Sequence, residues 1–99
     1  MSGVPAGFSS SRPNRIESAV GFAVEVSGRT GIKYFEDDRV MLIDSEVLAT
    51  PGAIALYRSS ICAWDSPDEA LIISEEDRER IIGNIRDALS SQGHTLQVI

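Results

Sequence analysis

The sequence predicts an α+β fold: an antiparallel sheet of four to five strands with one C-terminal amphipathic helix packed on one face, in the order β-β-β-β-α-β. Three observations support this prediction. The first half alternates apolar and polar residues with the period of two that is typical of strands. A later segment repeats its apolar residues at helical spacing. The strands come as a run before the helix, an order typical of α+β domains.

The composition of residues 1–17 predicts a flexible N-terminal tail. They are rich in Gly, Ser and Pro, including the run Ser9-Ser10-Ser11, and they show no apolar periodicity. Residues 18–99 are then expected to form a single α+β domain, since 99 residues fit one domain.

Four strands are expected in the first part of this domain. The predicted strands are Ala19–Val26, Ile32–Glu36, Arg39–Ser45 and Ala53–Arg58. In the first of them one face is strongly apolar, with Val20, Phe22, Val24 and Val26. Asp37-Asp38 form the expected tight reversal between the second and third strands. Because Val40–Ile43 are apolar on both faces, the third strand is predicted to be central in the sheet.

One helix is expected after Ser74. Ser74 is a good N-cap with Asp77 three residues later, and Glu75–Asp77 place negative charge in the first turn, where the helix dipole favours it. The apolar stripe consists of Ile81, Ile82, Ile85, Ala88 and Leu89. Gly93 is the expected stop, and a short last strand follows at Leu96 and Val98. The stripe should pack on the apolar face of the first strand.

The bulk composition limits the classes of partner. The formal net charge is −6 and the pI is near 4.6, which argues against nucleic acid and anionic membranes as partners. The same acidity could equally serve solubility alone. A single cysteine, Cys62, excludes an intramolecular disulfide and a Cys-rich zinc site. Without a secretory signal at the start, or an apolar run of roughly 20 residues, a cytoplasmic location is expected.

The residues offer little for catalysis, and we predict a non-enzyme without cofactor or metal. His94 is the sole histidine, and a dipole partner at the helix end or a simply exposed residue is favoured over a general base. Cys62 lies between Ile61 and Ala63, which favours a buried small hydrophobe over a nucleophile. Asp37-Asp38 or the acids at 65–69 could bind a divalent cation, but the spacing over Asp65–Asp77 lacks the alternation and glycine of a calcium loop. A solvated acidic face is favoured over a metal site.

Two acidic groups remain as candidates for contact with a partner. The helix start explains Glu75–Asp77, whereas the turn and loop acids have no such structural role. The predicted partner-binding residues are Glu36, Asp37, Asp38, Asp65, Asp68 and Glu69. Trp64, just before the loop acids, is favoured as a core anchor, with an interface anchor as the alternative.

Several segments together resemble a family of small bacterial immunity proteins, which are encoded beside polymorphic or contact-dependent toxins. The segments are Thr30-Gly31-Ile32-Lys33-Tyr34 with Glu36 and Arg39, Ile43–Glu46, Ile61–Trp64 with Pro67, and Ile73–Ile85. The resemblance spans about Val24–Ile99. It implies a non-enzymatic protein that binds and blocks a cognate toxin in the cytoplasm, the toxin often being a basic nuclease. It carries over no contact residues.

Two other functions remain open from the sequence. A structural or regulatory homodimer could form through an exposed edge strand, either Thr95–Ile99 or the Ala53 strand. A small enzyme could use His94 with a carboxylate.

Overall fold

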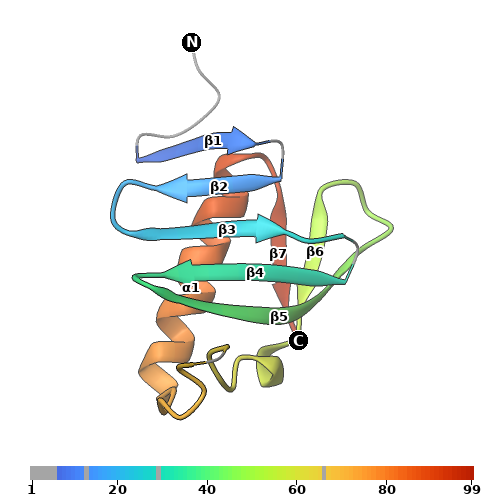
Figure 1. Ribbon diagram of the computed structural model, residues 1–99. Helices are drawn as coiled ribbons and strands as arrows, with labels where there is room; N and C mark the ends of the chain where they lie inside the picture. The colour runs from blue at the N-terminus through green and yellow to red at the C-terminus, as the bar shows by residue number, and fades with distance from the viewer. Residues whose placement is uncertain (1–6, 13, 29, 66) are drawn as a thin grey trace.

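The computed structural model describes residues 7–12, 14–28, 30–65 and 67–99 (Figure 1). It has seven strands, one α-helix and one short 3-10 helix within these residues. The elements are β1 (Phe8–Arg12), β2 (Arg15–Ser18), β3 (Phe22–Val26), β4 (Gly31–Glu36), β5 (Arg39–Val47), β6 (Ala53–Leu56), η1 (Arg58–Ser60), α1 (Glu75–Ser91) and β7 (Thr95–Val98). The α+β class with a single C-terminal helix is therefore confirmed.

The strands form one mixed sheet in the order β1-β2-β3-β4-β5-β6-β7. Each neighbouring pair is antiparallel except β6 and β7, which are parallel. The predicted sheet of four to five antiparallel strands was thus wrong in number and in one pairing. The parallel pair follows from α1, because a helix between two neighbouring strands carries the chain back to the end from which the first strand started.

Within the flexible tail predicted over residues 1–17, residues 8–12 form β1 and residues 15–17 form most of β2. Ile16 is buried, and Phe8 packs against the core with its ring 6.1 Å from that of Phe22. Backbone pairing with β3 and two well-placed apolar side chains hold a segment whose composition alone favours disorder. Residues 1–6 and 13 of that prediction lie outside the described residues.

The sheet curls around the helix. In Figure 1, β1–β5 lie side by side, β6 and β7 run across them, and α1 crosses behind the sheet. The predicted apolar stripe of α1 is confirmed, because Ile81, Ile82, Ile85, Ala88 and Leu89 are all buried in the core. Phe22 and Val24 from β3 belong to the same core.

The termini of α1 also agree with the sequence. Ser74 accepts a hydrogen bond from the backbone N–H of Asp77, and the Asp77 carboxylate accepts one from the backbone N–H of Ser74. This reciprocal capping box fixes where the helix begins. Gly93 follows the helix with a φ of +83°, a left-handed conformation that glycine adopts without strain.

Other single-residue predictions fail where the sheet has only one covered face. Val20, predicted on the buried face of the first strand, is 84% exposed, because β3 begins only at Phe22, after Gly21 turns the chain at φ +104°. β5 is central, between β4 and β6, but Leu42 is 53% exposed because no second layer covers that face.

In the segment after η1, Cys62 is exposed rather than buried, whereas its neighbour Trp64 is buried as predicted.

Candidate partner-binding surface

In Figure 1 the β2–β3 turn and the β4–β5 turn lie at the same side of the sheet, and the segment that leads into α1 runs below them. Backbone hydrogen bonds join them. The N–H of Asp37 donates to the carbonyl of Gly21 (3.5 Å), and the N–H of Asp65 donates to that of Val40 (2.7 Å). We call residues 19–21, 37–40, 65 and 67–72 the loop end. The structure thus brings together the two acidic groups that the sequence identifies separately.

The β4–β5 turn is held in an unusual backbone conformation. Asp37 has a φ of +56°, and it is the single non-glycine residue with positive φ among those described. Its carboxylate is exposed and lies 3.6 Å from the Arg39 guanidinium, at the outer limit of an ion pair. Arg39 in turn lies over the ring of Trp64, with 5.3 Å between the guanidinium carbon and the ring centroid. The buried Trp64 therefore supports the turn from within.

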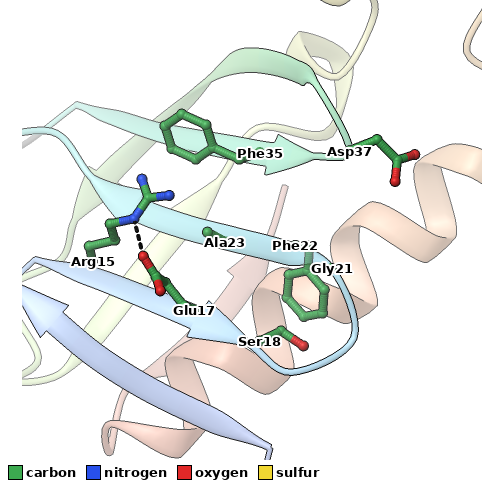
Figure 2. A pocket seen from close by; sticks show the side chains of 8 residues that line it. All are labelled: Arg15, Glu17, Ser18, Gly21, Phe22, Ala23, Phe35 and Asp37. Atoms are coloured by element: carbon green, nitrogen blue, oxygen red, sulfur yellow. Dashed lines mark hydrogen bonds and ion pairs between the residues drawn. The ribbon is translucent and has the colours of Figure 1, made fainter.

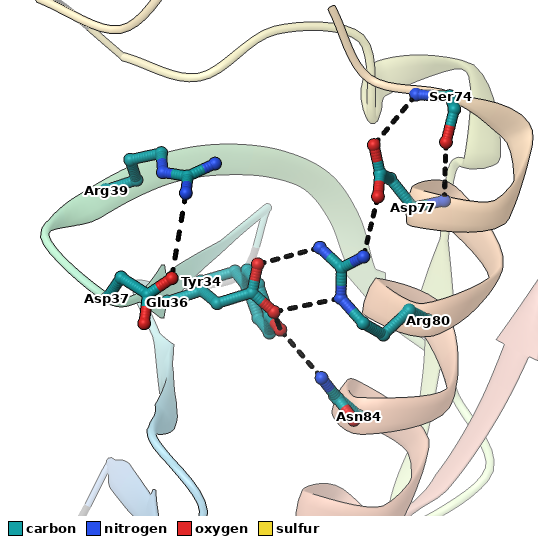
Figure 3. Close-up of polar contacts among 8 residues, drawn as sticks. All are labelled: Tyr34, Glu36, Asp37, Arg39, Ser74, Asp77, Arg80 and Asn84. Atoms are coloured by element: carbon teal, nitrogen blue, oxygen red, sulfur yellow. Dashed lines mark hydrogen bonds and ion pairs between the residues drawn. The ribbon is translucent and has the colours of Figure 1, made fainter. Parts of the chain in front are cut away.

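Glu36, the first of the predicted contact residues, is already engaged inside the protein (Figure 3). Its carboxylate accepts two hydrogen bonds from Arg80 of α1, at 3.1 Å from Nε and 2.8 Å from Nη2. It also accepts one from the Tyr34 hydroxyl at 3.0 Å, and that hydroxyl accepts from Asn84 Nδ2 at 2.8 Å. Only 16% of the Glu36 side chain is exposed. Its role is to tie β4 to α1.

Arg80 extends this network to the start of the helix. Its Nη1 lies 2.6 Å from Asp77 Oδ1, the carboxylate that also completes the capping box (Figure 3). The hydrogen bond from Arg80 and those from Ser74 lower the pKa of Asp77 to about 2. The two carboxylates beside Arg80 raise its pKa. Burial raises the pKa of Tyr34, against the opposing effect of the Asn84 hydrogen bond. Asp77, Arg80 and Tyr34 are therefore each held in one charge state at neutral pH.

The remaining predicted acids are placed differently. Asp38, Asp65, Asp68 and Glu69 form no ion pair within the described residues. The N–H of Asp68 donates to the carbonyl of Asp65 at 2.9 Å, so one hydrogen-bonded turn holds both residues. Elsewhere some acids are matched, as where Arg58 pairs with both Glu75 and Glu79, whereas Asp44 and Asp87 also form no ion pair among the described residues. What distinguishes the loop end is that four unmatched acids lie on two segments joined by a backbone hydrogen bond.

A groove of about 560 Å³ opens between the loop end and α1. It is lined by Val20, Gly21, Phe22, Glu36, Asp37, Arg39, Asp77, Arg80 and Asn84. Sequence reasoning missed Arg80 and Asn84 as part of this surface. Their i, i+4 spacing places them on one helix face, but the strand they meet is set by tertiary packing.

Figure 2 shows a smaller pocket of about 280 Å³ over β2–β4. There Arg15 lies 2.9 Å from Glu17 and stacks over Phe35, with 4.4 Å from the guanidinium carbon to the ring centroid. The hydrogen bond that Arg15 donates to Glu17 contributes most to the raised pKa of Arg15, and the one donated to Glu25 adds to it. Arg15 is therefore engaged by two carboxylates, and Asp37 of the loop end also lines this pocket.

The residues considered for chemistry lie apart from the loop end. His94 is exposed and lines a pocket of about 300 Å³ with Asn14, Val26, Val47 and Gly52–Ile54. Cys62 is exposed on the segment after η1. Within the described residues, no three His, Cys, Asp or Glu side chains gather where they could hold a metal ion.

Comparison with known proteins identifies the family. The family described as Immunity protein 74 matches residues 23–99, which is most of the chain. The chain belongs to the immunity protein 74 family. The resemblance to immunity proteins of toxin systems is thereby confirmed over nearly the same range. The comparisons with curated proteins and with solved structures gave no match.

The immunity protein 74 match begins at Ala23 inside β3, so it includes β4–β7 and α1 but excludes β1 and β2. Of the loop end, the β4–β5 turn and the segment before α1 fall inside the match, whereas the β2–β3 turn lies before it. Among the described residues, no helix has both the length and the apolar character needed to cross a membrane.

Proposed function

We propose that this immunity protein neutralises a cognate toxin by direct contact, and that the loop end forms the contact surface. The observation that carries the proposal is the set of four acids, Asp38, Asp65, Asp68 and Glu69, that are held on hydrogen-bonded turns and matched by no arginine. A carboxylate without an internal partner can form its ion pair with a second protein.

The toxin that fits this surface is basic, and a nuclease is one such protein because it must bind phosphates. Asp37 belongs to the surface as a secondary member, since its contact with Arg39 is long and its side chain is 72% exposed. Glu36 is withdrawn from the proposed contact set, because Arg80 and Tyr34 already occupy its carboxylate. No enzymatic activity is proposed.

The test is binding to the product of the adjacent upstream gene, after co-expression and purification at low salt. We expect a complex that weakens as salt is raised, because acids of this kind raise the association rate through screened charge. An adjacent product that forms no complex with the chain under these conditions would overturn the proposal.

A matched pair of charge reversals locates the surface. The double variant Asp65→Lys/Asp68→Lys should slow association by about tenfold or more at low salt, because attraction becomes repulsion. Asp44→Lys/Asp87→Lys makes the same change in net charge on other exposed parts of the molecule, at acids without ion pairs among those described. Equal slowing by both variants would show that net charge alone matters.

A homodimer is the second candidate, favoured by the open edges of the sheet. β1 and β7 each pair with one neighbour, so both expose an unpaired edge within the described residues. The Ala53 strand, predicted as a candidate edge, is instead β6, which lies between β5 and β7. Light scattering distinguishes the two candidates: a monomer that binds the upstream product supports the first.

A further inference from the structure

Apolar side chains are exposed beside the acids of the loop end. Six large apolar residues are exposed in the described part of the chain, and three of them belong to the loop end. Val20 is 84% exposed, Leu71 is 45% exposed and Ile72 is 91% exposed. The two most exposed of the six are therefore at the same end as the unmatched acids.

The backbone presents these apolar side chains in fixed positions. The N–H of Leu71 donates to the carbonyl of Asp68 at 3.0 Å, which continues the turns that hold the acids. Ile73, the residue after Ile72, packs against the core, and Ser74 then caps α1. The N–H of Val20 donates to the Ser18 hydroxyl at 3.0 Å. Ordered presentation lowers the entropic cost of binding.

We propose that Val20 and Ile72 are apolar anchors that insert into apolar recesses of the toxin, while the acids of the loop end contact basic side chains. This inference rests on the proposed function and specifies its contact. It requires a toxin surface that is basic and carries apolar recesses. Burying two nearly fully exposed branched side chains would remove apolar area from water on complex formation.

The negative charge of the loop end determines which class of partner could bind over these apolar side chains. A second copy of this chain would bring Asp65 and Asp68 toward the same acids, and like charges oppose association. Anionic lipid headgroups and nucleic acid are repelled for the same reason. A basic protein is the class of partner for which both the apolar and the charged residues are favourable.

The acids and the anchors should act on different rate constants. Long-range attraction by the acids acts before contact, so it raises the association rate and depends on salt. Burial of Val20 and Ile72 acts only after contact, so it slows dissociation and depends little on salt. This division gives the proposal a kinetic signature.

The experiment measures binding kinetics between the purified upstream gene product and variants of the full chain. Ile72→Ser should raise the dissociation rate about tenfold or more, since full burial of an isoleucine is a change of this order. Its association rate and the salt dependence of that rate should stay within about twofold of wild type. Val20→Ser should behave in the same way.

Ile99→Ser is the matched control, because Ile99 is also an exposed isoleucine, at 65%, but follows β7 outside the loop end. Its dissociation rate should stay within about twofold of wild type. Thermal melts should be unchanged for all three variants, because each side chain is largely in water already.

The outcomes separate the inference from the function on which it rests. If Asp65→Lys/Asp68→Lys slows association but Ile72→Ser and Val20→Ser leave dissociation unchanged, the anchors are rejected and the toxin-binding function stands. Equal acceleration of dissociation by Ile72→Ser and Ile99→Ser also rejects them. If the wild-type chain does not bind the upstream product, both proposals fall.

Discussion

The ion pair between Glu36 and Arg80 should contribute measurably to folding stability. It joins β4 to α1 across the groove beside the loop end, through hydrogen bonds of 2.8 and 3.1 Å. Glu36→Gln removes the charge but keeps the shape of the side chain, and Arg80→Met removes the guanidinium but keeps the aliphatic stem. We propose a double-mutant cycle with these two variants, because Arg80 also contacts Asp77 and single variants would mix the two contacts.

The expected coupling energy lies between two limits. Hydrogen bonds to charged groups contribute about 1.5–3 kcal/mol when sheltered, whereas exposed ion pairs contribute about 0.2–1 kcal/mol. The Glu36 side chain is 16% exposed and the Arg80 side chain is 44% exposed, so solvent screens one side of the pair. We therefore expect a coupling of about 1–2 kcal/mol.

Urea unfolding of the four proteins at neutral pH measures this coupling. With a slope of about 1–3 kcal/mol per molar urea, the effect is a midpoint shift that circular dichroism resolves easily. The pair Arg58–Glu79 is the control for an exposed ion pair, because the Arg58 side chain is 35% exposed and the Glu79 side chain is 59% exposed. A Glu36–Arg80 coupling of about 0.3 kcal/mol or less would refute the reasoning. Glu36 would then be restored as a contact residue.

Three further predictions concern substitutions at the start and in the buried face of α1. Ser74→Ala should lower the free energy of unfolding by about 1 kcal/mol, because it removes the N-cap acceptor of α1; an unchanged urea midpoint would contradict this. Asp77 has a pKa lowered from 3.8 to about 2, so its stabilising effect is complete above pH 3.8 and is lost as the pH falls toward 2. The stability gap between wild type and Asp77→Asn should therefore narrow over that interval in urea titrations. Ile85→Asp, at a fully buried position, should abolish the cooperative thermal melt, and a melt close to wild type would reject the packing of α1.

The helix could be predicted in detail because its signals are local. Ser74 and Asp77 form a capping box through neighbours in sequence, and the stripe around Ile85 depends only on spacing. The parallel pairing of β6 and β7 was also accessible, since the order strand, helix, strand favours it, but the short last strand was assigned to an antiparallel sheet.

The strands near the N-terminus could not be predicted because their stability comes from distant contacts. β2 is defined by pairing with β3 and by Ile16 in the core, and its own composition gives a weak signal. The same limit applies to the surface: the sequence identifies Glu36 as an acid but does not reveal that Arg80, 44 residues later, occupies its carboxylate. Exposure of Cys62 depends likewise on the course of a loop.

The positive φ of Asp37 sets folding stability against the proposed role of its carboxylate in toxin binding. Glycine adopts this conformation without strain, whereas a left-handed L-residue costs about 1–2 kcal/mol. The greater conformational entropy of the unfolded glycine variant offsets about 0.4–1 kcal/mol of the strain relieved. Asp37→Gly should therefore stabilise the domain by about 0–1.6 kcal/mol. The natural residue thus retains a carboxylate at the tip of the turn where glycine would be the better choice for folding alone. A trade of this kind is characteristic of positions selected for activity more than for stability.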